Sequence, residues 1–382
     1  MDSFLKNTNV FFMLLVCGSQ LFFKEYGIVT IPLYAMTGCW LFMRERKGMA
    51  DLWNFRIVCV VILWNIVNNY VLHSNVQTNI VFSSLLCIIG AFFTISSFDF
   101  FEFRDILFKQ LKFITVISII VQLWHDFIGG EPGRVSEESY LSFYIFNTEW
   151  GQSRLASIYW EPGMYQIVIM YVLAFFTDEF KDAQNWKQNL KKYGIFIVAL
   201  LYTQSTMGYI CLFLLFVTIF VQNNKVQRKV FLWPVYIGVV AAVGLVLWSS
   251  EAVQKKVMQR ESEVETSSYY IRLNDNISLA TMTMERPFVG YGMDTSEYQI
   301  RNESLNNLSA SNGWLYTSAT NGIPYLLLIL FFIYKGIKRQ ENAMAPAVVM
   351  SILLISQCNE YIVFFPYTFM YIFKFNEPDM SS

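Results

Sequence analysis

The sequence is poor in charge, and this shortage excludes most soluble proteins. Charged residues make up 15% of the 382 residues, whereas a water-soluble chain usually carries about 25%. Such a composition excludes a nucleic-acid binder and an ordinary cytosolic enzyme.

Cysteine and histidine are also scarce, with six and two residues. Most of the cysteines lie inside apolar runs and none has C-x-x-C spacing, so we interpret them as small apolar core residues. His73 and His125 are far apart and have no His/Cys/Asp spacing around them. We therefore expect no disulfide framework, no metal site and no cofactor. The polar start at 1–9 and the run after it show no persuasive cleavage site for a signal peptide.

What the chain does contain is apolar residues in separate runs. Hydrophobic residues make up 55%, aromatic residues 18%, and the mean hydropathy is +0.39. Because a membrane-spanning helix needs about 20 mostly apolar residues, we predict an all-α polytopic membrane protein with ten to twelve spans. The expected spans are 9–23, 26–43, 57–72, 79–98, 113–128, 162–177, 193–204, 207–222, 230–249, 314–334, 345–357 and 361–373.

The basic residues predict the orientation of these spans. Nineteen of the 28 Lys and Arg residues fall in both termini and in the segments 44–56, 99–112, 178–192, 223–229 and 335–341. By the positive-inside rule this side is cytoplasmic, so both termini are expected inside the cell. Residues 1–382 then form a single integral membrane domain.

Two long polar segments, 126–160 and 250–312, fall on the outer side. Loops of this length in a compact protein are usually functional, although a passive linker remains an alternative. The second loop is expected to carry a short amphipathic helix at 269–284, in which Arg272 and Asn276, four residues apart, share one face.

Three helix N-termini are predicted to face the outer side. Glu161 and Pro162 mark one, because proline suits the first helical turn; the segments 203–208 and 309–313 are rich in capping residues. If these N-termini converge, their unpaired N–H groups form an anion-binding floor. The alternative is ordinary caps scattered around a bundle.

Outer-side arginines favour the anion site. Arg154 precedes Glu161 by seven residues, Arg272 lies in the first turn of the predicted helix, and Arg286 follows its end. Guanidinium groups are bidentate partners of phosphate oxygens, so these residues indicate a diphosphate site. Glu161 is either a helix cap or a group that takes a proton from, or orients, a hydroxyl nucleophile.

The order of these motifs resembles the Wzy-type O-antigen polymerase and ligase superfamily. The resemblance extends from Arg154 and Trp160-Glu161-Pro162-Gly163 to the segment 311–323, about half of the chain. It rests further on Thr203-Gln204-Ser205-Thr206-Met207-Gly208 and on Arg272 through Glu285-Arg286-Pro287-Phe288-Val289-Gly290-Tyr291-Gly292.

The resemblance implies a glycosyltransferase of the bacterial inner membrane. Its donor and acceptor would be undecaprenyl-diphosphate-linked oligosaccharides, its surroundings the lipid bilayer, and a chain-length regulator is an open partner. Glu161 and Arg272 are the expected catalytic residues. The residues expected to bind the diphosphate and glycan are Arg154, Arg286, Ser205, Thr206, Asn276, Ser311 and Asn312.

Two departures favour the polymerase branch. The ligase branch usually has a His-Asn pair where this chain has Ser311 and Asn312, and an arginine where it has Thr206. Alternatives that stay open are a ligase that transfers glycan to the lipid A core and a flippase for lipid-linked oligosaccharides. Transporters often show two similar halves, and no convincing repeat is found here.

Overall fold

The computed structural model describes most of the helical part of the chain. The described residues are 2–19, 21, 26–45, 52–73, 76–128, 154–176, 179, 186–223, 268–306, 312–339, 346–356 and 366–375. Within them the chain is helical, and strand pairing is limited to isolated bridges between Ser19 and Tyr159 and between Val76 and Thr295. The predicted span 230–249 lies outside the described residues.

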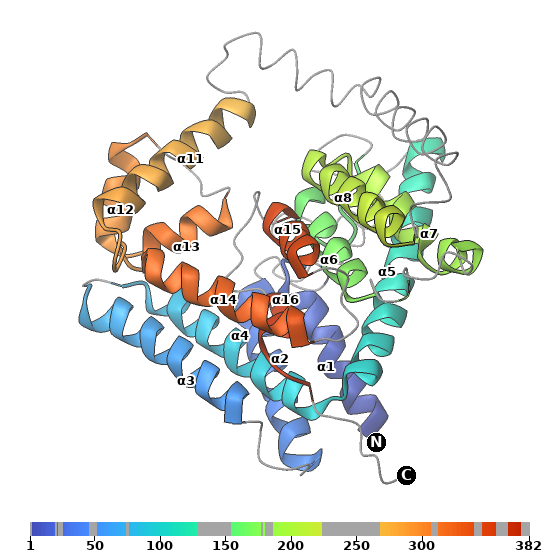
Figure 1. Cartoon of the computed structure of the whole chain (residues 1–382), viewed down its shortest axis with the longest axis horizontal. Helices are drawn as coiled ribbons and strands as arrows, with labels where there is room; N and C mark the ends of the chain where they lie inside the picture. Colours follow the sequence, from blue (N-terminus) through green and yellow to red (C-terminus); the bar gives the residue numbers. More distant parts are fainter. Residues whose placement is uncertain are drawn as a thin grey trace.

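Figure 1 shows how the described helices are arranged. The first half contains α1 (Asp2–Val16), α2 (Tyr26–Glu45), α3 (Leu52–Ile66), the π-helix η1 (Val67–Val71), α4 (Thr78–Ser97), α5 (Phe100–Ile128), α6 (Pro162–Phe175), α7 (Trp186–Thr203) and α8 (Thr206–Asn223). The second half contains α11 (Ser268–Glu285), α12 (Ser296–Ser304), α13 (Gly313–Asn321), α14 (Ile323–Arg339), α15 (Pro346–Ser356) and α16 (Pro366–Ile372).

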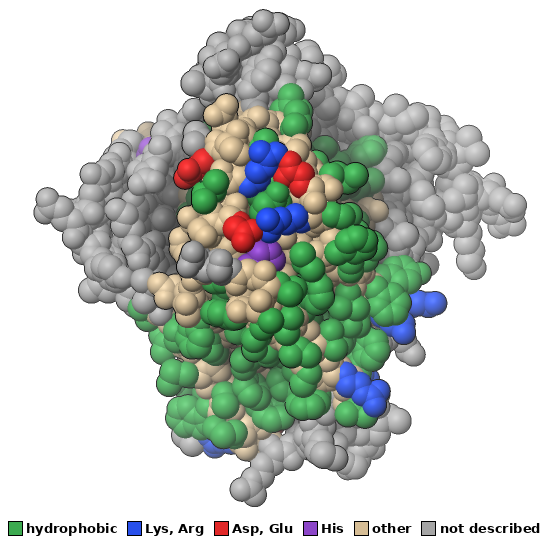
Figure 2. All heavy atoms as spheres, turned by 90° about the vertical axis from the view of Figure 1, so that its left-hand side faces the viewer, with side chains coloured by type: hydrophobic (Ala, Val, Ile, Leu, Met, Phe, Trp, Pro, Cys, Tyr) green, Lys and Arg blue, Asp and Glu red, His purple; other side chains and the backbone are tan. Residues whose placement is uncertain are grey.

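The described chain is almost wholly helical and three of its helical segments have the length and composition of membrane spans, which confirms the predicted all-α polytopic membrane fold. Among the described residues, Leu52–Val71, Thr78–Ser97 and Phe100–Ile128 are long and apolar enough to cross a bilayer. Large apolar side chains such as Leu63 and Phe113, 62% and 67% exposed, point away from the protein. Figure 2 shows a broad hydrophobic surface of this kind, with charged side chains gathered mainly above it.

Several predicted spans differ from the observed helices: the span predicted at 9–23 is α1, which already ends at Val16, and two others differ for reasons that the structure shows. The span predicted at 113–128 is part of α5, which starts at Phe100 because the buried Arg104 pairs with Glu179 at 3.2 Å and lies over the Phe176 ring. The span predicted at 314–334 is broken into α13 and α14 at Gly322, whose φ is +84°. A Cβ at Gly322 would lie 2.2 Å from the Phe288 carbonyl oxygen, so the break makes room for the turn that follows α11.

Helix α6 forms the centre of the bundle. All of its residues are buried, so it has no polar face, as expected for a helix surrounded by others. Aromatic side chains fill its surroundings: the Phe175 ring packs 4.7 Å from that of Tyr371, and the Tyr371 hydroxyl donates to the Tyr171 carbonyl at 2.8 Å. These contacts hold the C-terminal half of α6.

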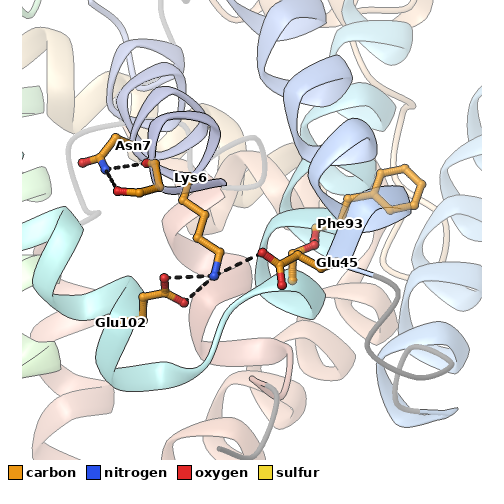
Figure 3. Close-up of polar contacts among 7 residues, drawn as sticks. Lys6, Asn7, Glu45, Phe93 and Glu102 are labelled. Atoms are coloured by element: carbon orange, nitrogen blue, oxygen red, sulfur yellow. Dashed lines mark hydrogen bonds and ion pairs between the residues drawn. The ribbon is translucent and has the colours of Figure 1, made fainter. Parts of the chain in front are cut away.

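Ion pairs gather several helix ends on one face of the bundle. Lys6 of α1 bonds the Glu102 carboxylate of α5 at 2.7 and 2.9 Å and lies 3.3 Å from Glu45 of α2 (Figure 3). These contacts overcome the effect of burial and raise the pKa of Lys6. Glu179 in turn bonds Lys192 of α7 at 2.7 Å. The segments around 44–56, 99–112 and 178–192, which the charge pattern puts on the cytoplasmic side, thus share a face.

The loop helices α11 and α12 lie at the opposite end of the molecule from the N-terminus (Figure 1). Helix α11 packs along α13, and a small hydrophobic cluster between them contains Leu279, Met282 and Tyr316. The helices that carry the predicted site are therefore attached to the bundle through α13.

Candidate active site

The segment 154–160 is held between the ends of two helices. The Leu155 N–H donates to the Tyr202 carbonyl of α7 at 2.9 Å, and the Trp160 N–H donates to the Gly18 carbonyl after α1 at 3.1 Å. Within the segment Ser157 has a positive φ of 60°. A non-glycine residue in this conformation persists only where its surroundings impose it, so the path of the segment is fixed by tertiary contacts.

Glu161 and Gly163 shape the beginning of α6. Glu161 precedes the helix in an extended conformation (φ −149°, ψ 159°), and its side chain accepts no capping hydrogen bond from the first turn. A Cβ at Gly163 would lie 2.4 Å from Glu161 Oε1. Glycine therefore leaves the space that the carboxylate occupies over the helix start. The absence of a capping bond argues against the interpretation of Glu161 as a cap.

Ser205 caps α8, as its sequence context predicts. Its hydroxyl accepts a hydrogen bond from the Gly208 N–H at 3.4 Å, and the exposed Thr206 begins the helix. A Cβ at Gly208 would lie 3.0 Å from Gln166 Oε1, so the first turn of α8 packs on the first turns of α6. Two helix N-termini, each with a partial positive charge, are thus adjacent.

Arg154, Glu161 and Arg272 lie close enough to interact electrostatically. Burial lowers the pKa of the Arg154 guanidinium and the positive charge of Arg272 lowers it further, while Glu161 and Tyr209 oppose the shift without cancelling it. The Arg154 Nε also donates to the Thr203 carbonyl at 3.1 Å. An arginine stays charged at neutral pH in spite of such a shift, so this group holds two positive charges and one negative charge.

Asn276 and Asn312 link α11 to the start of α13. The Asn312 Oδ1 caps α13 by accepting from the N–H groups of Trp314 and Leu315, both at 3.2 Å, and its Nδ2 donates to Asn276 Oδ1 at 3.0 Å. Asn276 lies one helical turn after Arg272, which places the cap of α13 near the arginine group. Ser311, also predicted to bind substrate, lies outside the described residues.

Arg286 stands apart from the other predicted residues. It follows Arg272 by 14 residues, about 21 Å at the rise of an α-helix. Its Nη1 lies 2.5 Å from Glu297 of α12, and its guanidinium lies 4.4 Å from the centre of the Tyr291 ring. The structure therefore uses Arg286 to join α11, α12 and the following turn, and does not bring it to Arg154.

Tyr209 is a site residue that the sequence analysis missed. It lies in the first turn of α8, and its charge interaction with Arg154 places it beside the arginine group. Its hydroxyl donates to the Leu201 carbonyl at 2.8 Å. A tyrosine at the start of an apolar run carries no distinguishing signal, because the chain contains 22 tyrosines.

The described residues contain no group of three metal-ligating side chains. What they bring together is two guanidinium groups, the N-termini of α6 and α8, and one carboxylate. Such a set suits an anionic group such as a diphosphate. The carboxylate beside it can accept a proton from a hydroxyl.

A family model described as O-Antigen ligase matches residues 193–332. The matched region runs from α7 to α14 and includes Ser205, Arg272, Asn276 and Asn312, whereas Arg154 and Glu161 precede it. No curated protein matches the sequence.

Proposed function

We propose that the chain is a polymerase of a bacterial surface polysaccharide, and the match of residues 193–332 to a family model described as O-Antigen ligase supports this. The substrate on both sides of the reaction is a repeat unit carried on undecaprenyl diphosphate. The reaction takes place at the outer face of the inner membrane, with both termini of the chain in the cytoplasm and a chain-length regulator as a further partner.

The reaction breaks one glycosidic bond and forms another. The bond between the donor sugar C1 and the diphosphate oxygen breaks, and its electron pair leaves with undecaprenyl diphosphate. A hydroxyl at the non-reducing end of the acceptor forms the new bond to C1 and gives its proton to the Glu161 carboxylate. The acceptor glycan grows by one donor glycan, and one lipid diphosphate is released.

The observation that carries this proposal is the electrostatic interaction between Arg154 and Arg272. The two guanidinium groups are partly buried and repel each other, and burial also removes water from around the Arg154 charge. An anion bound between them would offset both the repulsion and the lost solvation. Because the leaving group gains negative charge in the transition state, such preorganised cations lower the barrier. The adjacent N-termini of α6 and α8 add partial positive charge.

The sequence of the site favours the polymerase over the ligase. Position 311 is a serine and position 206 a threonine, where the ligase branch has histidine and arginine. With no imidazole at 311, Glu161 is the candidate proton acceptor in this group. A polymerase needs only the hydroxyl of a second lipid-linked glycan as acceptor.

The decisive variant is Arg272→Ala, with Arg301→Ala as its matched control. Arg301 is another outer-loop arginine, but it is paired with Glu285. Purified protein in detergent is mixed with lipid-linked repeat units, and chain length is read on a gel. We expect wild type and Arg301→Ala to make ladders, and Arg272→Ala to lose about 3 kcal/mol of barrier lowering, roughly a hundredfold in rate.

Several outcomes would contradict the proposal. Normal ladders from Arg272→Ala would remove this arginine from the site. Absence of longer glycans with wild-type protein, where no membrane barrier exists, would favour a flippase. Growth only when a lipid A core acceptor is added would favour a ligase.

A further inference from the structure

The end of α3 is a π-helix that carries buried polar side chains. Residues Val67–Val71 form η1, and Asn68 and Asn69 within it are fully buried. His73, two residues later, is 7% exposed. Short π-helices are rare and frequently occur at functional sites, and buried amides need partners. The partners of these side chains lie in the second outer loop and at the α13–α14 break.

Asn68 contacts the break between α13 and α14. Its Nδ2 donates to the Thr320 carbonyl at 3.0 Å and approaches Asn321 Oδ1 at 3.3 Å. Helix α13 ends at Asn321, and Gly322, with a positive φ, follows it as the residue between α13 and α14. Asn68 therefore gives a side-chain hydrogen bond to a carbonyl near the helix end, where the helix itself supplies no N–H partner.

Asn69 contacts the loop that follows α11. Its Oδ1 accepts a hydrogen bond from the Met293 N–H at 2.6 Å, and its Nδ2 donates to the Asn65 carbonyl at 2.8 Å. The side chain is thus fixed at both ends, and it joins the membrane helix to the outer loop through a buried bond.

His73 lies between two carbonyl oxygens. Nδ1 is 2.7 Å from the Asn68 carbonyl, and Nε2 is 3.1 Å from the Gly290 carbonyl. A neutral imidazole has one N–H and donates to one of them, whereas an imidazolium donates to both. The ring also packs against Gly292, where a Cβ would lie 3.1 Å from His73 Cγ.

The turn itself is bound to the same helix break. The N–H groups of Tyr291 and Gly292 donate to the carbonyls of Ala319 and Thr320, both at 2.8 Å, and the Ile323 N–H donates to the Pro287 carbonyl at 2.7 Å. The π-helix, the turn and the break therefore form one hydrogen-bonded junction. Helix α11 ends at Glu285, just before this junction.

We propose that Asn68, Asn69 and His73 are positioning residues that set where α11 holds Arg272. None of them lies in the matched region 193–332, and their role in transfer rests on the function proposed above. Arg272 lies 13 residues before the end of α11, about 20 Å along the helix. A tilt of about 3° at the junction then moves Arg272 by about 1 Å, enough to lower a rate by about a hundredfold.

The test compares Asn69→Ala with Asn54→Ala. Asn54 is an equally buried asparagine of the same helix that also donates and accepts one bond each, both at 2.7 Å, but to Lys374 at the other end. We expect Asn69→Ala to lower the transfer rate at saturating substrate at least tenfold, and Asn54→Ala to lower it less than twofold. Asn68→Ala, measured in the same way, gives a second variant at the junction. Equal rates for the Asn69 and Asn54 variants would overturn the proposal.

A distance measurement separates this proposal from the proposed function. Spin labels at Ile277→Cys on α11 and Leu201→Cys on α7, in protein whose native cysteines are replaced, report the position of α11 without any substrate. Both original residues are exposed. We expect the distance distribution to shift or broaden with Asn69→Ala and to stay unchanged with Asn54→Ala. An unchanged distribution with Asn69→Ala refutes the positioning role, whether or not the wild type makes polymer.

Discussion

Replacing Gly163 with alanine should separate the role of Glu161 in catalysis from any role in stability. The new Cβ would lie 2.4 Å from Glu161 Oε1, whereas non-bonded contacts of carbon lie near 3.5 Å. The carboxylate must therefore retreat by about 1 Å. Since Oε1 is the end of a flexible side chain, this movement strains no backbone.

The expected effect is large on the rate and small on stability. A displacement of about 1 Å at a reacting group lowers a rate by about a hundredfold. The free energy of unfolding should change by less than about 1 kcal/mol, the range of a glycine-to-alanine change in a helix. The initial rate of chain growth on lipid-linked repeat units and thermal unfolding in detergent measure the two quantities.

Gly194→Ala is the matched control. Gly194 lies within α7, and a Cβ there would meet only Leu190 Cδ1 at an ordinary 3.8 Å. This variant should keep the wild-type rate. If the Gly163→Ala protein transfers glycan as fast as the Gly194→Ala protein, the Glu161 carboxylate does not act at the reacting hydroxyl.

Two further predictions concern ion pairs outside the arginine group. Arg286→Ala should lower the transfer rate by less than about threefold, because the Arg286 guanidinium pairs with Glu297 and Arg286 lies about 21 Å from Arg272 along the helix. A loss of rate equal to that of Arg272→Ala would show that Arg286 belongs to the diphosphate site. Glu179→Gln should lower the free energy of unfolding by about 2 kcal/mol at pH 7, the scale of a charged hydrogen bond. Burial raises the pKa of Glu179, but bonds from Lys192 and Tyr193 outweigh it, so the pKa lies below its usual range. The stabilisation is therefore complete above about pH 5, and it is lost as the pH falls below about 4.3, the usual pKa of a glutamate, and through the lowered pKa. The unfolding temperatures of the variant and the wild type should therefore converge at acidic pH. A constant difference between the two temperatures down to about pH 3 would contradict this.

Local sequence signals predicted the starts of several helices. Pro162 begins α6, Ser205 caps α8 and Asn312 caps α13. These signals act within three or four residues, where a proline ring or a side-chain oxygen meets the first N–H groups of a helix. The amphipathic helix predicted at 269–284 is α11, Ser268–Glu285.

Apolar run length predicted the class of fold but not every helix boundary. Hydropathy treats Arg104 as a break, whereas α5 continues through it because Glu179 and three phenylalanine rings surround the guanidinium. Hydropathy also joins α13 to α14 across Gly322. That helix breaks because the Phe288 carbonyl occupies the place of a Cβ.

For the candidate site, the sequence alone determined the chemistry of its members and the tertiary structure decided which of them meet. Arginines at 154, 272 and 286 are alike in sequence, but the docking of α11 brings Arg272 to Arg154 and leaves Arg286 about 21 Å away. The asparagines of η1 lie in an apolar run and have partners some 220 to 250 residues later in the chain. A pattern of residues encodes contacts one or two helical turns away, whereas contacts between distant segments depend on how whole helices pack.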